Sequence, residues 1–167
     1  YPVYAKLQKD KKALSSYFLL SVHALSLLAI PILCFVFFYS SQIVTLVYGQ
    51  NWTKTAEIIK VLAFVGILKA VGNPGGSLIL AMGRADIGFW WNVFWTVLLT
   101  GTYGLTMYLS DDVTYVACSL LFLTITTSGI WYFILNKLAS IDLRLMFGRL
   151  IKTFVAVAFI GHLSTYL

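Results

Sequence analysis

Lys69 is the residue whose type and position most strongly indicate chemistry, because it lies inside a long apolar stretch, residues 56–82. At about 1.5 Å per helical residue, it sits about 20 Å along that stretch. A charge near the centre of a membrane costs at least about 2.5–3.5 kcal/mol, so it usually faces a bundle interior or a wet cavity. Helical spacing puts Gly72, Asn73 and Gly76 on the same side as Lys69. The pattern predicts a narrow polar stripe, with Lys69 and Asn73 as candidate binding residues for an anionic substrate.

A second interpretation keeps Lys69 out of any cavity. The carbon chain of a lysine can lie along apolar surface while its ammonium group reaches an interface. Lys69 would also lie near an interface if the span predicted for residues 56–82 were displaced by one helical turn. The two interpretations differ in whether Lys69 faces a polar cavity or the lipid boundary.

The sequence Asn73-Pro74-Gly75-Gly76 interrupts the same stretch. Pro74 removes one helical hydrogen bond and clashes with the preceding turn, so the helix should kink near residues 70–74. Gly75 and Gly76 let a neighbouring helix approach closely. Two interpretations remain open: a kink that serves packing, or a hinge made of Pro74, Gly75 and Gly76 in a helix that moves.

The remaining residues offer no catalytic constellation. The sequence has no nucleophile elbow, no phosphate-binding glycine loop and no carboxylates paired in one place. Cys34 and Cys118 lack CxxC spacing, and His23 and His162 form no cluster, so we expect two buried free thiols and no metal site. We therefore predict a protein that is not an enzyme and that needs no cofactor.

Composition indicates that these residues are placed by a membrane protein. Hydrophobic residues make up 60% of the chain and charged residues 11%, against about 45–50% and about 25% in soluble domains. The net charge of +6 comes mainly from two basic groups beside apolar spans, which favours lipid headgroups and topology over nucleic acid. The groups are Lys6, Lys9, Lys11 and Lys12, and Lys137, Arg144, Arg149 and Lys152.

Apolar runs of spanning length predict an all-α fold, a polytopic transmembrane bundle of about five helices. Because the sequence begins at Tyr1 and its last apolar run stops at Leu167, we expect a piece of a longer protein with its final span cut short. The predicted spans are 17–39, 56–82, 87–109, 113–135 and 147–167.

The positions of Lys and Arg predict the orientation of these spans. The N-terminal segment, the GRAD turn and the segment after residue 135 are rich in basic residues and are expected to be cytoplasmic. Within the GRAD turn, Arg84 and Asp86 are expected to pair. Two mixed segments, 41–52 and 138–152, are expected to lie along the outer and inner surfaces, the first as a short separate helix. Trp90, Trp91 and Trp95 are expected to anchor their span at an interface.

Three segments resemble a known family: YPVYAKLQKDKKAL, IPILCFVFFYSSQIVTLVYGQNW and IIKVLAFVGILKAVGNPGGSLILAMGRADIGFWWN. They look like the C-terminal part of polysaccharide flippases of the Wzx type, within the multidrug/oligosaccharidyl-lipid/polysaccharide exporter superfamily. Three features carry the resemblance: basic residues and a proline before a span, a G-x-x-W outer loop, and a small-residue break leading to A-x-G-R-x-D. The remainder of the chain matches only as hydrophobic helices.

The resemblance implies part of the second lobe of a two-lobed transporter in the bacterial cytoplasmic (inner) membrane. It would move undecaprenyl-diphosphate-linked oligosaccharide across that membrane by alternating access, with membrane lipids, a polysaccharide polymerase and other export components as partners. Two alternatives remain. A drug/cation antiporter of the same superfamily would need a buried carboxylate, and a membrane-embedded glycan-modifying enzyme would need a reactive His or acid.

Overall fold

The computed structural model describes residues 10–164 of the chain, and for residues 11, 160 and 162–164 it describes the backbone alone. Among the predicted features, Lys6, Lys9, the side chains of Lys11 and His162 and the last residues of the fifth span therefore lie outside the described part of the chain.

Within the described range the chain is helical and contains no strand, which confirms the all-α prediction. Short turns separate most of the helices. The helices are α2 (Lys11–Tyr48), the 3-10 helix η1 (Gln50–Trp52), α3 (Thr53–Gly72), α4 (Pro74–Ala81), α5 (Ala85–Leu109), α6 (Val113–Ala139) and α7 (Leu143–Ser164).

Local capping explains where the longest helices begin and end. The Asp10 carboxylate accepts hydrogen bonds from the first backbone amides of α2, at 3.0 and 3.1 Å, and Asp112 accepts one from Thr114 at the start of α6, at 2.9 Å. α2 ends at Gly49, whose φ of 87° suits a residue without a side chain. α6 ends at Ser140, which adopts a left-handed conformation with φ of 50°.

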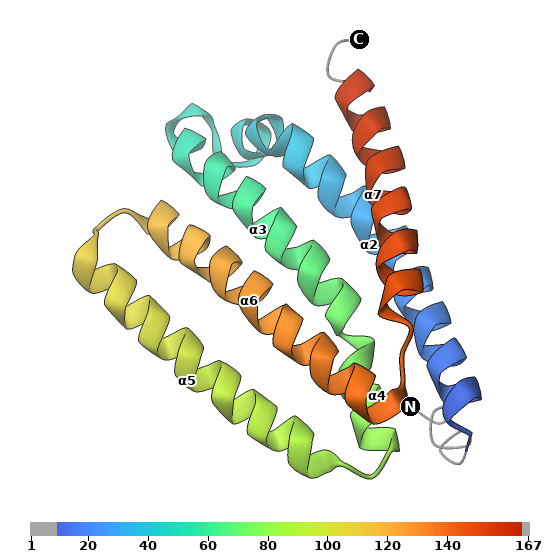
Figure 1. Cartoon of the computed structure of the whole chain (residues 1–167). Coiled ribbons are helices and arrows are strands. Elements are labelled where there is room, and N and C mark those ends of the chain that lie inside the picture. The colour runs from blue at the N-terminus through green and yellow to red at the C-terminus, as the bar shows by residue number, and fades with distance from the viewer. Residues whose placement is uncertain (1–9, 165–167) are drawn as a thin grey trace.

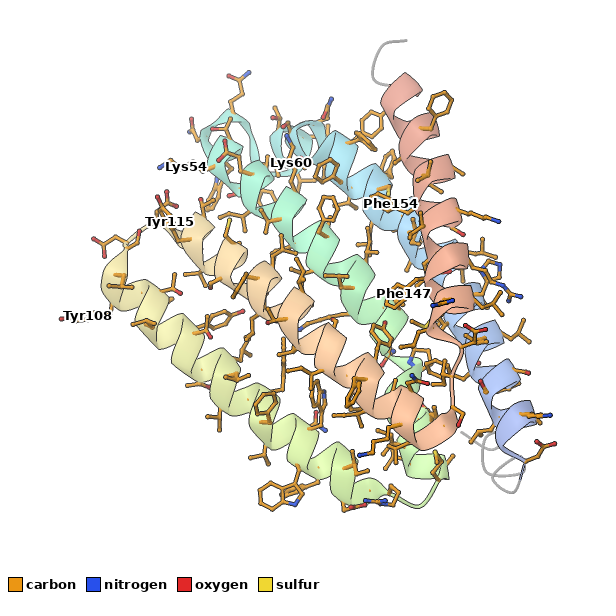
Figure 2. The ribbon with its side chains drawn as sticks, in the orientation of Figure 1. Lys54, Lys60, Tyr108, Tyr115, Phe147 and Phe154 are labelled. Carbon is orange, nitrogen blue, oxygen red and sulfur yellow. The ribbon has the colours of Figure 1, made fainter. Side chains whose placement is uncertain are left out.

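The helices form a layer in which sequence neighbours run in opposite directions. Figure 1 shows α7, α2, α3, α6 and α5 side by side in that order, and each neighbouring pair makes tertiary contacts. The start of α2, the turn between α4 and α5, and the connection between α6 and α7 share one end of this layer. Lys54, Tyr108 and Tyr115 lie near the opposite end (Figure 2).

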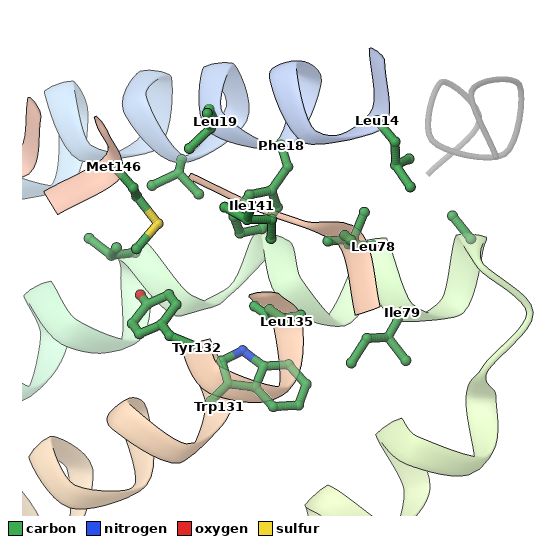
Figure 3. Close-up of a cluster of buried hydrophobic side chains, with 14 residues drawn as sticks. Leu14, Phe18, Leu19, Leu78, Ile79, Trp131, Tyr132, Leu135, Ile141 and Met146 are labelled. Atoms are coloured by element: carbon green, nitrogen blue, oxygen red, sulfur yellow. The ribbon is translucent and has the colours of Figure 1, made fainter. Parts of the chain in front are cut away.

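The main apolar core lies at the end of the layer that holds α4. Figure 3 shows Leu14 and Phe18 of α2 facing Leu78 of α4, with Leu135 of α6 and Met146 of α7 closing the cluster. All five side chains are at most 2% exposed. This cluster fixes α4 against its neighbours, so the segment after Pro74 has a defined place in the bundle.

Two of the described helices, Lys12–Tyr48 and Val113–Ala139, are long and apolar enough to cross a membrane, with mean hydropathies of 2.4 and 1.7. α3 carries Lys54, Glu57, Lys60 and Lys69, and α5 carries three tryptophans, which lower their mean hydropathy. Crossing by the other predicted spans stays a prediction.

The prediction that residues 41–52 form a separate short helix is wrong, whereas the position of residues 138–152 along the inner surface stays a prediction. Residues 41–48 are the last turns of α2 rather than a separate helix, and only residues 50–52 form the short 3-10 helix. Ser40, the first residue after the expected end of the span, is fully buried within α2. Residues 138–152 are divided between the end of α6, a short connection and the first turns of α7, because α7 starts at Leu143.

Candidate functional site

A cavity of about 340 Å³ lies among α3, α4, α5 and α6. α6 lies between α3 and α5 and contacts both (Figure 1). The lining combines one cation, two amides, three hydroxyls, three indoles and several glycines. The residues are Leu68, Lys69, Gly72, Asn73, Gly76, Gly88, Trp91, Asn92, Trp95, Thr124, Thr127, Ser128 and Trp131.

The stripe predicted from helical spacing lies along one wall of this cavity. Lys69, Gly72, Asn73 and Gly76 all line it, although the chain passes from α3 to α4 between them. Lys69 and Asn73 are both exposed. The structure thus brings the two candidate binding residues to one cavity, while substrate binding by them stays a prediction.

Lys69 also has a partner on the opposite wall. Its Nζ lies 5.0 Å from the centroid of the Trp95 ring on α5, a cation–π distance. An ammonium group held over an indole face keeps its charge and remains accessible to an anion from the cavity side. The pair therefore connects α3 with α5 across α6.

The helix is interrupted between α3 and α4, within the range where a kink is predicted, although Asn73 at the interruption keeps a right-handed helical conformation; the kink itself stays a prediction. Asn73 separates the two helices and Pro74 is the first residue of α4, where its missing N–H costs least. The amide of Gly76, which would bond to Gly72 in an unbroken helix, donates to the Asn73 carbonyl at 3.3 Å. The Gly72 carbonyl instead accepts the indole N–H of Trp131 from α6, at 3.4 Å.

The two glycines after Pro74 have different surroundings. A Cβ on Gly75 would lie 2.7 Å from Nε1 of Trp131 and 2.8 Å from a methyl carbon of Leu135, closer than real Cβ atoms approach other atoms. A Cβ on Gly76 would meet nothing within 4 Å. Gly75 therefore serves packing against α6, as the kink interpretation expects, and Gly76 leaves open space in the cavity. A hinge at Pro74, Gly75 and Gly76 stays a prediction.

The α5 wall was not predicted to belong to this site. Trp91 and Trp95 were expected to be interface anchors, yet both line the cavity, and the Trp91 ring stacks on Trp131 with centroids 4.7 Å apart. Trp90, which is 67% exposed, faces outward and fits the anchor role. Asn92 lies one residue further on, and its side chain donates to the Gly88 carbonyl at 2.9 Å.

The α6 wall was also missed. Thr124 and Thr127 are buried, and their hydroxyls donate to carbonyls one turn earlier, Leu120 at 2.7 Å and Leu123 at 2.6 Å. Their oxygens keep lone pairs that can accept hydrogen bonds. Regular small and hydroxyl residues in a span are the available sequence signal, but they do not say which neighbour they face.

Some charged groups near the helix ends are paired or cap a helix. Arg84 and Asp86 form the expected ion pair at 3.0 Å, with both side chains at least half exposed. The hydrogen bond from Arg84 lowers the pKa of the Asp86 carboxyl. At the other end, the bond from the Thr114 amide lowers the pKa of Asp112, and the nearby charge of Lys54 adds to this.

The two cysteines and His23 lie away from the cavity. Both cysteines are free thiols, but only Cys34 is buried, so the prediction of two buried thiols is wrong for Cys118. The Nδ1 atom of His23 is buried and has no hydrogen-bond partner in the described structure.

Comparisons with known proteins agree with the resemblance seen in the sequence. A family model described as "Polysaccharide biosynthesis protein" matches residues 1–57. Teichuronic acid biosynthesis protein TuaB of Bacillus subtilis is 30% identical over 98% of this chain and 34% of its own length. Lipopolysaccharide biosynthesis protein WzxC of Escherichia coli is 37% identical over 59% of this chain and 20% of its own. Amylovoran biosynthesis protein AmsL of Erwinia amylovora is 25% identical over 71% of this chain and 30% of its own.

No solved structure matches the chain. The chain spans about a third or less of the length of these relatives. Their names share polysaccharide biosynthesis, and the apolar helices fit a membrane protein. These matches, over residues 1–57 for the family model and over nearly the whole chain for TuaB, support the resemblance to Wzx-type polysaccharide flippases.

Proposed function

We propose that the chain is part of the second lobe of a transporter that moves undecaprenyl-diphosphate-linked oligosaccharide across the bacterial cytoplasmic membrane. The transporter works by alternating access and serves polysaccharide export. The resemblance to Wzx-type flippases supports the transport class, and the names of the relatives support a polysaccharide cargo.

The observation that carries this proposal is the cavity beside Lys69. A site for a phosphate-bearing glycan needs positive charge for the phosphate and polar groups for the sugar. Lys69 supplies the charge, and Asn73 and Asn92 supply amides on facing walls. The indoles of Trp91 and Trp95 add flat apolar faces, and such a mixture of aromatic walls with few polar groups is typical of ligand sites.

The break between α3 and α4 supports the mechanism. Alternating access needs elements that change direction, and irregular backbone at membrane depth is tolerated where it is buried in protein or lines a cavity. Gly72 and Asn73 lie at the break and also line the cavity. In this proposal Pro74, Gly75 and Gly76 form the hinge, and Lys69 and Asn73, which both precede it, move relative to the rest of α4 when it bends.

The proposed setting is multi-pass insertion in the inner membrane, with membrane lipids around the bundle. A polysaccharide polymerase and other export components would receive the translocated unit. The protein would act on its cargo without chemical change to it, as a carrier rather than an enzyme.

Deletion of the full-length gene in a strain without a substitute flippase tests the function. Loss of surface polysaccharide together with accumulation of lipid-linked units on the cytoplasmic side is the expected result. Normal surface polysaccharide in that strain would overturn the proposal. Two further readouts separate the alternatives: an antiporter predicts a change in drug susceptibility, and a glycan-modifying enzyme predicts exported polysaccharide of altered composition.

A further inference from the structure

Trp131 occupies a special place because its indole belongs to two features at once. It lines the cavity, and its N–H donates to the carbonyl of Gly72 at the break between α3 and α4. The two residues are 59 positions apart in sequence, so this bond is tertiary and joins α6 to the break.

The Gly72 carbonyl needs such a donor because its helical one is engaged elsewhere. The Gly76 amide bonds to Asn73, one residue closer than in a regular α-helix. A carbonyl left unpaired within the membrane is unfavourable, so protein groups or water must satisfy it. In this structure the Trp131 indole fills that role.

Packing holds the indole at this point. The Trp131 side chain is buried, its ring lies against that of Trp91 at a tilt of 30°, and its Nε1 lies 2.7 Å from where a Cβ on Gly75 would be. Any side chain at Gly75 would bring its Cβ to 2.7 Å from Nε1, too close for the indole to stay where it is. The absence of a Cβ at Gly75 is therefore what lets the N–H reach Gly72.

The bond itself is long. At 3.4 Å between Nε1 and the carbonyl oxygen, it lies beyond the usual range of about 2.7–3.2 Å for N–H···O hydrogen bonds. A stronger acceptor, such as a phosphate oxygen, competes well for a donor held this loosely. Such an acceptor in the cavity would come close to this N–H, because Gly72 and Trp131 both line the cavity.

We propose that Trp131 is a positioning residue that fixes the α3–α4 break while the cavity is empty and releases it when an anionic ligand takes its N–H. The proposal rests on the proposed function, since it gives the ligand a way to act on the hinge. Lys69 attracts the anion into the cavity. The anion then takes the Trp131 N–H, and the break between α3 and α4 loses that hydrogen bond. The two residues thus have different tasks at one site.

Hydrogen–deuterium exchange of the full-length protein in lipid nanodiscs tests whether Trp131 fixes the break between α3 and α4. Trp131→Phe keeps an aromatic ring and removes the N–H, so exchange of the backbone amides in residues 72–80 is expected to rise about 2- to 10-fold. Trp91→Phe is the matched control, because it removes an indole N–H from the same stacked pair without touching Gly72. A rise in Trp131→Phe that extends equally through α6, or an equal rise in Trp91→Phe, would overturn the positioning role.

Gly75→Ala provides an independent variant that leaves Trp131 in place. Its methyl group displaces Nε1 from Gly72, so the same local rise in exchange is expected. Unchanged exchange in this variant would contradict the proposal. Gly129→Ala on α6 is its control, because a Cβ there meets nothing within 4 Å and Gly129 does not line the cavity.

Addition of ligand tests whether an anion releases the break. Undecaprenyl diphosphate is expected to raise exchange at residues 72–80 in the wild type and to leave Trp131→Phe unchanged, whereas undecaprenol, which lacks the diphosphate, leaves both unchanged. Ordinary ligand binding protects a site, so protection or no change in the wild type would overturn the coupling. Export in the deletion strain is a separate readout. If export is lost in the deletion strain but the ligand does not change exchange, only the coupling by Trp131 is wrong. If export persists in that strain, the proposed function itself is wrong.

Discussion

Lys69 of α3 and Trp95 of α5 meet across α6, with the ammonium nitrogen 5.0 Å from the centre of the indole ring. Neither helix packs extensively against the other, and α6 lies between them. The pair therefore bridges the two walls of the cavity. It places a positive charge beside an aromatic ring, where an anion in the cavity can reach both residues.

Lys69→Gln in the full-length protein is expected to reduce polysaccharide export about tenfold or more at limiting substrate. A hydrogen bond to a charged group is worth about 1.5–3 kcal/mol, and about 1.4 kcal/mol corresponds to a factor of ten. The measurement is surface polysaccharide at matched protein level. Lys60→Gln is the control, because Lys60 belongs to the same helix and does not line the cavity. Equal export by the two variants would remove Lys69 from the mechanism.

Gly76→Leu should block the cavity without unfolding the protein. A Cβ at Gly76 meets nothing within 4 Å, so the new side chain has room to extend into the space that a ligand would fill. Leucine in place of a helical glycine also favours the helix by up to about 1 kcal/mol. We expect export to fall while thermal stability in detergent is kept. Gly104→Leu, equally uncrowded but outside the cavity, should leave both unchanged; export retained in Gly76→Leu would argue against transport through this space.

Asp112 should give α6 a pH-dependent start. Its pKa is lowered mainly by the hydrogen bond from the Thr114 amide, so the carboxylate stabilises the folded state at pH values above its unfolded pKa of about 3.9. This contribution is lost as the pH falls through the lower, folded pKa. Thermal unfolding in detergent should show Asp112→Ala less stable than the wild type at pH 7. The difference in stability between the two proteins should decrease at lower pH.

Asp112→Asn serves as the control for that titration. Asparagine is also a good N-cap but does not titrate, so its stability should lack this component of the pH dependence. A gap between wild type and Asp112→Ala that stays constant with pH would show that the cap is not ionic.

Cysteine labelling in intact cells should reveal the orientation of α6. In a background with Cys34 and Cys118 changed to alanine, Asp111→Cys should react with a membrane-impermeant maleimide from outside. Asn136→Cys should react only after permeabilisation, because it lies at the end of α6 near the basic residues. Both positions are exposed in the structure. Labelling of both from the same side would exclude α6 as a membrane span.

Sequence patterns located some helices closely and others poorly, for identifiable reasons. The predicted spans 87–109 and 113–135 lie within α5 and α6, because the GRAD turn and the SDD turn between apolar runs leave few other boundaries. The end of α2 was misplaced by nine residues, from residue 39 to Tyr48, because Ser40 and its polar neighbours looked like a loop. Serines do not stop a helix, whereas Gly49 does through its positive φ.

One wall of the cavity could be predicted from the sequence, and the walls formed by α5 and α6 could not. Lys69 and Asn73 share a helical face, so spacing within one segment was enough to group them. Trp95 and Thr127 belong to other helices, and the side on which they pack depends on tertiary contacts that periodicity does not encode. The tryptophans were also misleading, because the same residue type anchors spans at interfaces and lines ligand sites.

The position of α6 between α3 and α5 has a consequence for how the site comes into being. α5 and α6 are joined by a turn of a few residues, so they can pair as a local helical hairpin with little loss of chain entropy. The contact between Gly72 and Trp131 closes a loop of 59 residues and is expected to form later. Trp91 and Trp131 would then be stacked before α3 arrives. The cavity forms only when the hairpin of α5 and α6 docks against α3 and α4, because all four helices line it. Ligand binding at Lys69 would therefore indicate that these helices have assembled.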